Sequence, residues 1–180
     1  MNNAIQEVGA VLEKFQEGYT HRDLTKLDEF IHLFEQSAEV EMIGIGAAQR
    51  GSYEWFEGID SIKEIIQSDW ENWGDVQIDV SGAKIRVHGD VAWVSTTATL
   101  AKTDLSEVLP FFLEMIKEKL EDESKPPEER MTDIALFSVN RLSDMQREVG
   151  HQWPQVITMV LTKNQPGWQI AALHWSIPAA

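Results

Sequence analysis

The sequence contains no cysteine in its 180 residues. This absence excludes disulfide bonds, thiolate nucleophiles and cysteine-ligated zinc or iron–sulfur sites. Long apolar runs are also missing, because no stretch reaches the roughly 18 consecutive apolar residues that a membrane-spanning helix needs. The N-terminal segment carries acidic residues within a helical pattern, which is unlike a signal peptide. We therefore expect a cytoplasmic protein that does not bind a membrane.

Positive charge is scarce relative to negative charge. Fifteen lysines and arginines face 30 aspartates and glutamates, so the formal net charge is −15. A surface of this sign repels a phosphate backbone, and nucleic acid is not an expected partner. The five histidines are not spaced as metal ligands, and there is no HExxH motif, glycine-rich phosphate loop or catalytic-triad signature. We expect neither a metal nor a cofactor.

The pattern of apolar residues predicts helices first and strands afterwards. Helical spacing predicts three helices over residues 4–19, 24–34 and 60–73, with one strand over residues 38–46 before the third. Alternating patterns then predict a strand over residues 76–80 and two β-hairpins, over residues 83–102 and 155–177. The chain is long enough for one sizeable core, so a single α+β domain over residues 1–180 is expected.

Three stretches carry a family resemblance: GSYEWFEGIDSIKEII, HGDVAWVS and GWQIAALHWS. In their order and spacing they resemble the SnoaL-like branch of the nuclear-transport-factor-2-like superfamily, over residues 1–101 and 152–178. The resemblance implies a cystatin-like α+β fold, in which three N-terminal helices pack on a curved, mainly antiparallel sheet. It also implies a cone-shaped pocket between the helices and the sheet.

Residues 103–150 depart from this resemblance. Two amphipathic segments joined by an acidic turn predict a helical hairpin, inserted between the last two β-hairpins at about residues 103–150. Its apolar stripe must pack on something, because an amphipathic helix is stabilised mainly by burial of its apolar face. Three alternatives are open: a lid over the pocket, a contact between subunits, or additional core.

The last predicted strand suggests where a ligand would bind. Strict alternation places Trp168, His174 and Ser176 on one face. We take as ligand-binding candidates the aromatic and polar side chains expected near a pocket, namely Tyr19, Trp55, Trp70, Trp73, Trp93, Trp168, His174 and Ser176. His174 is the only candidate acid–base catalyst, because imidazole titrates near neutral pH. The alternative is that His174 and the tryptophans are ordinary core residues.

The superfamily includes enzymes such as ketosteroid isomerase, scytalone dehydratase and limonene epoxide hydrolase. Matching the isomerase's strand carboxylate to this sequence gives Met42, which cannot accept a proton. Matching its helical tyrosine gives Phe15, which lacks the hydroxyl group. The resemblance therefore argues against isomerase chemistry, and from the SnoaL-type polyketide cyclases only His174 is carried over.

Two functions remain after these exclusions. The first is a homodimer that binds a small hydrophobic molecule in an apolar pocket without a reaction. The second is a cofactor-free lyase, isomerase or hydrolase that acts on a hydrophobic substrate, with His174 as acid or base. We expect dimerisation through the outer face of the sheet, because both faces of its longest strands carry apolar residues. The sequence does not decide which face of the sheet lines the pocket.

Overall fold

A computed structural model of the chain describes residues 3–45, 47, 50, 54–102, 108–145 and 148–177. The chain divides into two compact units. The first unit contains Met1–Leu100 and Gln152–Ala180, and the second contains Ala101–His151. The core of the first unit is one continuous cluster of buried apolar side chains between helices and a sheet.

Helices α1 (Asn3–His21), α2 (Leu27–Ile31) and α3 (Ile59–Asn72) belong to the first unit, with a 3-10 turn, η1 (Leu24–Lys26), before α2. Helix α1 buries residues at spacings of four and three, namely Val8, Leu12, Phe15 and Tyr19. The Asp23 carboxylate caps η1 by accepting hydrogen bonds from the Thr25 amide and hydroxyl. The predicted second helix is shorter than expected, because Phe34 instead forms a parallel bridge with Ile170.

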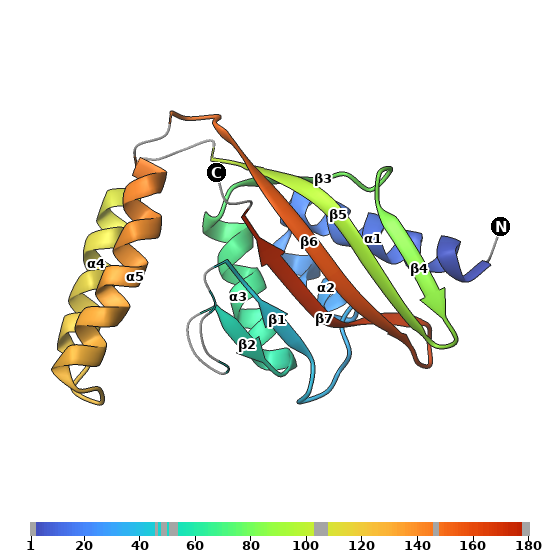
Figure 1. Cartoon of the computed structure of the whole chain (residues 1–180), viewed down its shortest axis with the longest axis horizontal. Coiled ribbons are helices and arrows are strands. Elements are labelled where there is room, and N and C mark those ends of the chain that lie inside the picture. Colours follow the sequence, from blue (N-terminus) through green and yellow to red (C-terminus); the bar gives the residue numbers. More distant parts are fainter. Residues whose placement is uncertain are drawn as a thin grey trace. The chain divides into compact units, whose positions relative to one another are not determined.

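Seven strands form one sheet in the order β2-β1-β7-β6-β5-β3, with β4 paired to β5. Their bounds are β1 Glu41–Ile43, β2 Trp55–Glu57, β3 Asp75–Ile78, β4 Lys84–His88, β5 Val91–Ala101, β6 Gln152–Lys163 and β7 Trp168–Ser176. Strands β1 and β7 are parallel, whereas β1–β2, β4–β5 and β6–β7 are antiparallel. Figure 1 shows helices α1, α2 and α3 together on one face of this sheet. The predicted α+β fold with a mainly antiparallel sheet is confirmed.

The two faces of the sheet follow from the burial pattern. On β6, Gln155, Ile157, Met159 and Leu161 are buried toward the helices, and the residues between them point to the outer face. A register shift between Val160 and Leu161 interrupts the pairing with β7. Trp168 and Ile170 on one side of the shift are therefore buried, and so are Leu173 and Trp175 on the other. Strict alternation does not hold along β7, because a bulge reverses the phase of the strand.

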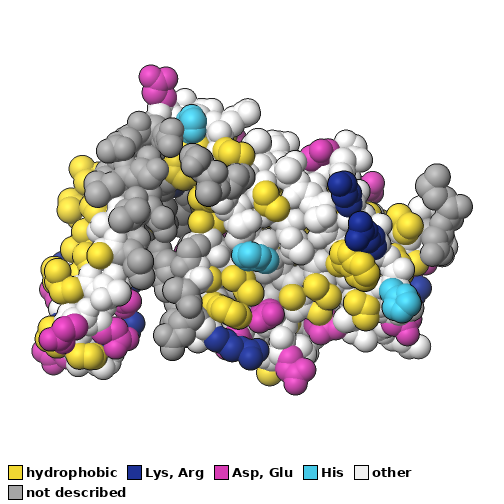
Figure 2. Space-filling model, viewed as in Figure 1, with side chains coloured by type: hydrophobic (Ala, Val, Ile, Leu, Met, Phe, Trp, Pro, Cys, Tyr) yellow, Lys and Arg dark blue, Asp and Glu magenta, His cyan; other side chains and the backbone are white. Residues whose placement is uncertain are grey.

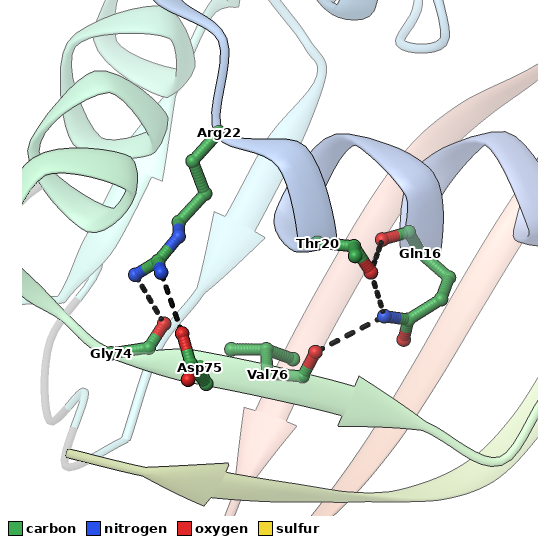
Figure 3. A network of polar contacts seen from close by, with 6 residues as sticks. All are labelled: Gln16, Thr20, Arg22, Gly74, Asp75 and Val76. Atoms are coloured by element: carbon green, nitrogen blue, oxygen red, sulfur yellow. Dashed lines mark hydrogen bonds and ion pairs between the residues drawn. The ribbon is translucent and has the colours of Figure 1, made fainter. Parts of the chain in front are cut away.

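Strand β3 ends the strand order, and its outer side is contacted by Gln16 of α1 and by Arg22, which follows α1. The Gln16 amide donates to the Val76 carbonyl at 3.1 Å and accepts from the Ile78 amide. Arg22 donates to the Gly74 carbonyl at 3.1 Å and to the Asp75 carboxylate (Figure 3). Gln16 and Arg22 thus stand where a neighbouring strand would otherwise pair with β3.

The second unit contains two α-helices that pack against each other, α4 (Val108–Glu121) and α5 (Pro127–Met145). The turn between them is capped by the Asp122 carboxylate, which accepts from the Ser124 amide and hydroxyl. An ion pair of 2.8 Å joins Lys125 to Asp133. At the other end the Gly150 amide donates to the Lys102 carbonyl at 2.9 Å, so the chain enters and leaves this unit at one place.

Candidate functional site

Aromatic side chains fill the space between the sheet and the helices near the C-terminal ends of α1 and β7. They are Phe15, Tyr19, Phe30, Phe34, Trp70, Trp73 and Trp175. Trp175 contacts three rings of this cluster, those of Phe15, Tyr19 and Trp73. Its ring centroid is 5.1 Å from that of Trp73 and 5.9 Å from that of Tyr19. Trp73 is half-buried, whereas Trp175 is 1% exposed, so Trp73 lies nearer the surface of the cluster.

Tyr19 brings a hydroxyl group into this apolar cluster. The hydroxyl donates a hydrogen bond of 2.9 Å to Oδ2 of Asp69 on α3. Burial raises the pKa of Tyr19 well above its usual value, and the negative charge of Asp69 and the hydrogen bond to it raise this pKa further. Tyr19 therefore stays protonated at neutral pH and acts as a hydrogen-bond donor. Phe15, the residue matched to the isomerase tyrosine, lies one turn earlier in α1. Its ring centroid is 5.1 Å from that of Tyr19.

Polar atoms without partners lie in the same interior. Within the described part of the chain, both amide atoms of Gln155 and Nε1 of Trp175 and of Trp70 are buried and make no hydrogen bond. Gln155 is 1% exposed and belongs to the inward-facing residues of β6. Because Ile157 pairs with Trp175, Gln155 and Trp175 are diagonal neighbours on this face, a separation that long side chains can bridge. The interior thus presents an unpaired amide and an unpaired indole N–H on two residues that are diagonal neighbours.

Four of the predicted ligand-binding residues are on the inward side: Tyr19, Trp70, Trp73 and Trp168. The first three belong to the aromatic cluster. Trp168 lies at the opposite end of β7, where its Nε1 donates to Glu7 at 3.0 Å and Lys163 Nζ is 5.6 Å from its ring centroid. The Lys163 and Trp168 hydrogen bonds lower the pKa of Glu7. Trp168 therefore joins α1 to the β6–β7 turn, away from the candidate site.

The other four predicted residues, Trp55, Trp93, His174 and Ser176, belong to the outer face of the sheet. His174 pairs with Ile43 and Thr158 and is exposed. The predicted grouping of Trp168 with His174 on one face is wrong, because the β7 bulge lies between them. His174 thus cannot serve as an acid or base in the interior. A ligand-binding role for these four residues stays a prediction, and it would concern the outer face.

Two residues of the candidate site were not predicted from the sequence. Asp69 falls on the same helical stripe as Ile62 and Ile66, and Gln155 falls on the same alternation as Ile157 and Met159. The sequence signal for such residues is a polar side chain at a position where the helix or strand period predicts an apolar one. For Gln155 this signal was missed, because Gln155 is the first residue of the predicted strand and so does not interrupt an apolar pattern.

A separate depression of about 440 Å³ lies at the surface, between the segment after α2 and the β6–β7 turn. It is lined by His32, Glu35, Gln36, Ser37, Asn164, Gln165, Pro166 and Gln169. Its carboxylate, Glu35, already accepts hydrogen bonds from Thr162 and Asn164. Asn164 and Gln169 also bond across to the segment after α2, so these side chains hold the two loops together, and the depression is not our candidate for the functional site.

None of the helices described is long and apolar enough to cross a membrane. Over the same residues, histidine and the carboxylates do not gather in groups of three that could hold a metal ion.

Helices on one face of a curved mixed sheet define the nuclear-transport-factor-2-like cone fold, and solved structures share it. A protein of that superfamily from Salmonella enterica is 15% identical, with a TM-score of 0.60, over 99% of this chain and 93% of that chain. A ketosteroid isomerase-like protein from Erwinia carotovora atroseptica is 14% identical, with a TM-score of 0.60, over 100% of both chains. A protein with a cystatin-like fold from Novosphingobium aromaticivorans is 9% identical, with a TM-score of 0.59, over 99% of this chain and 84% of that chain. Identities this low show the fold alone.

The sequence itself gives the family. The profile of the SnoaL-like domain matches residues 8–118. The chain therefore belongs to the SnoaL-like family, as the resemblance implied. Among curated proteins, none is significantly similar in sequence to this chain.

Proposed function

We propose that this protein binds a small, largely apolar molecule between the sheet and the helices, beside Trp175, Trp73 and Gln155. The observation that carries the proposal is the buried side-chain amide of Gln155, which makes no hydrogen bond. Nε1 of its diagonal neighbour Trp175 makes none either. A buried polar group without a hydrogen bond costs about 1–3 kcal/mol. Aromatic walls with a few converging polar groups are typical of small-molecule sites. A ligand that pairs with these groups would recover that cost.

Binding is favoured over catalysis by the chemistry of the buried groups. Tyr19 is held protonated, and Asp69 accepts its hydrogen bond. Asp69 is only partly buried, and the fully buried polar residues described besides Tyr19 are Thr96 and Gln155, neither of which is an acid or a base at neutral pH. The alternative is a cofactor-free lyase, isomerase or hydrolase. Its one supporting observation is the Tyr19 hydroxyl, a donor suited to a developing negative charge on oxygen.

Replacing Gln155 with leucine tests the binding site. The free energy of unfolding is expected to rise by about 1–3 kcal/mol, because an unpaired buried amide is removed and the volume is nearly kept. Binding of the neutral fluorescent ketone 6-propionyl-2-dimethylaminonaphthalene is expected to weaken at the same time. Urea unfolding and fluorescence titration measure the two effects.

The matched control for this experiment is Gln77→Leu, the same change at an exposed position of β3. It is expected to leave both stability and probe binding unchanged. If Gln155→Leu also leaves both stability and probe binding unchanged, ordered water satisfies the Gln155 amide in the wild-type protein, and the proposed site is wrong. If wild-type protein does not bind the probe, binding of an apolar ketone is excluded.

We also propose that the outer face of the sheet joins two copies of the chain. The exposed apolar side chains there include Val91 at 43%, Trp93 at 40% and Val160 at 37%. The outward residues of β5, β6 and β7, all of them described, include no aspartate or glutamate, although the chain carries a net charge of −15. In Figure 2 the middle of this face carries uncharged side chains, with charged ones toward its margins. A surface of three strands without acids lets two strongly acidic proteins approach each other there.

Replacing Trp93 with glutamate is expected to abolish this dimer, because each copy would bring a negative charge into an apolar contact. Light scattering should give the wild-type protein about twice the 20.5 kDa mass of one chain when the pair forms through the sheet. The Trp93→Glu variant should give a lower mass. Gln77→Glu, which adds the same charge on edge strand β3, is the control. A wild-type mass of one chain at micromolar concentration would contradict the dimer.

A further inference from the structure

We propose that helix α4 pairs in an antiparallel manner with α4 of a second copy of this chain. The contact is the α4 stripe, which we define as Leu109, Leu113, Ile116 and Leu120. Leu109 is 50% exposed, Leu113 56% and Leu120 51%, and Ile116 is partly exposed. In Figure 2, apolar side chains gather along the part of the surface that α4 forms. Exposed apolar stripes of this kind mark sites of association.

The spacing of the stripe is that of a coiled-coil seam. Its four residues follow one another at intervals of four, three and four, which is the alternation of the a and d positions of a heptad. Leu113 and Leu120 take the a positions, and Leu109 and Ile116 take the d positions. Phe112, which is 8% exposed, lies on a neighbouring side of the helix. The side that α4 already buries is therefore not the stripe, and the stripe is left as a seam for another helix.

The charges of α4 suit a second copy of this acidic chain. Its acids, Glu114, Glu118 and Glu121, occupy the b and f positions, which point away from the seam. The edges of the seam carry Lys117 and Lys119, near the C-terminal end only, and the other end has Pro110 and Phe112. No acid of α4 therefore meets an acid of the second copy across the seam.

The same charges select the antiparallel arrangement. A parallel pair would gather the lysines of both copies at one end, where they repel. An antiparallel pair separates them and sets each pair of lysines against Pro110 and Phe112 of the other copy. It also matches a against d in every layer, with Leu113 facing Ile116 and Leu120 facing Leu109. The contact is isologous, so it closes after two copies.

Sedimentation of the full chain tests the pairing. All variants carry Trp93→Glu, so that the proposed sheet contact does not contribute and the two proposals are tested separately. The Trp93→Glu chain is expected to reach twice the chain mass at high concentration, and addition of Leu113→Glu is expected to restore the mass of one chain. Met131→Glu makes a comparable apolar-to-acid change at a 59% exposed site on α5, and it should leave the mass unchanged.

Disulfide trapping tests the orientation, and the absence of natural cysteine makes single thiols unambiguous. Leu109→Cys and Leu120→Cys are prepared separately, oxidised alone, and then oxidised as a mixture. Antiparallel pairing predicts a disulfide-linked dimer in the mixture and little in either variant alone. Equal cross-linking of each variant with itself would show parallel pairing and overturn the proposal. An unchanged mass on addition of Leu113→Glu, with equal helicity by circular dichroism, would overturn it too.

Discussion

Replacing Gly18 with alanine is expected to lower the free energy of unfolding by about 2–3 kcal/mol, as overpacked cores do. A Cβ atom at this position of α1 would lie 2.2 Å from Phe30 Cε2 and 3.1 Å from Trp70 Cζ2. Neither ring can move away easily, because the Phe30 and Trp70 centroids are 4.9 Å apart and both rings are buried. The gain in helix propensity from glycine to alanine, about 1 kcal/mol, is smaller than this clash.

Gly9 in the same helix provides the control. A Cβ atom there would meet only Ile85 Cδ1 at 3.8 Å, an ordinary van der Waals contact. Gly9→Ala is therefore expected to stabilise the protein by about 0.5–1 kcal/mol through helix propensity alone. Urea unfolding of the two variants measures both effects. Equal stability of Gly18→Ala and Gly9→Ala would contradict the close packing of α1 against Phe30.

Replacing Trp175 with alanine is expected to cost about 3–5 kcal/mol, the range found for large buried aromatic residues. Trp175 is 1% exposed, and its ring contacts Phe15, Tyr19 and Trp73 from three directions. The cavity would have rigid aromatic walls, so the surrounding side chains could not collapse into it. Thermal unfolding and near-ultraviolet circular dichroism follow the loss of stability and of fixed aromatic packing.

Trp55→Ala is the matched comparison, since Trp55 is half-buried on the outer face and donates a 3.1 Å hydrogen bond to Glu41. We expect a loss of about 1 kcal/mol, because this hydrogen bond and the side chain of Trp55 are only partly buried. A loss at Trp175 no larger than that at Trp55 would mean that the aromatic cluster is loosely packed. By contrast, tighter binding of the naphthalene ketone by the Trp175→Ala variant would agree with a ligand site beside this ring.

The sequence was a good guide wherever one period continued without interruption. Helix α1 and the β4–β5 hairpin lie within a few residues of their predicted bounds, because 3.6-residue and two-residue periods report burial directly. Strand β2 was not predicted, since three residues are too few to show a period. The second helix was predicted too long because the pairing of Phe34 with Ile170 joins residues far apart in the sequence.

The candidate site was predicted less well than the fold, for a single geometric reason. The β7 bulge adds a residue between Ile170 and Leu173, and a shift of one residue moves every later side chain to the opposite face. His174 and Ser176 therefore moved out of the predicted site, and Trp175 moved in. Tyr19, Trp70 and Trp73 do lie on the inward side, because no irregularity interrupts α1 or α3, and their role in ligand binding stays a prediction. A bulge depends on the pairing of two strands, and one strand's sequence does not reveal it.

The contacts of Gln16 and Arg22 along β3 limit how further strands can add to this sheet. Sheets with open edges recruit further strands, and growth of that kind has no natural end. Here Gln16 and Arg22 occupy one edge, and the opposite edge is β2, a strand of only three residues. Addition of a strand at either of these two edges is therefore disfavoured. Removing the Gln16 amide would leave the Val76 carbonyl and the Ile78 amide of β3 without these partners, and a strand of another chain could then pair with them.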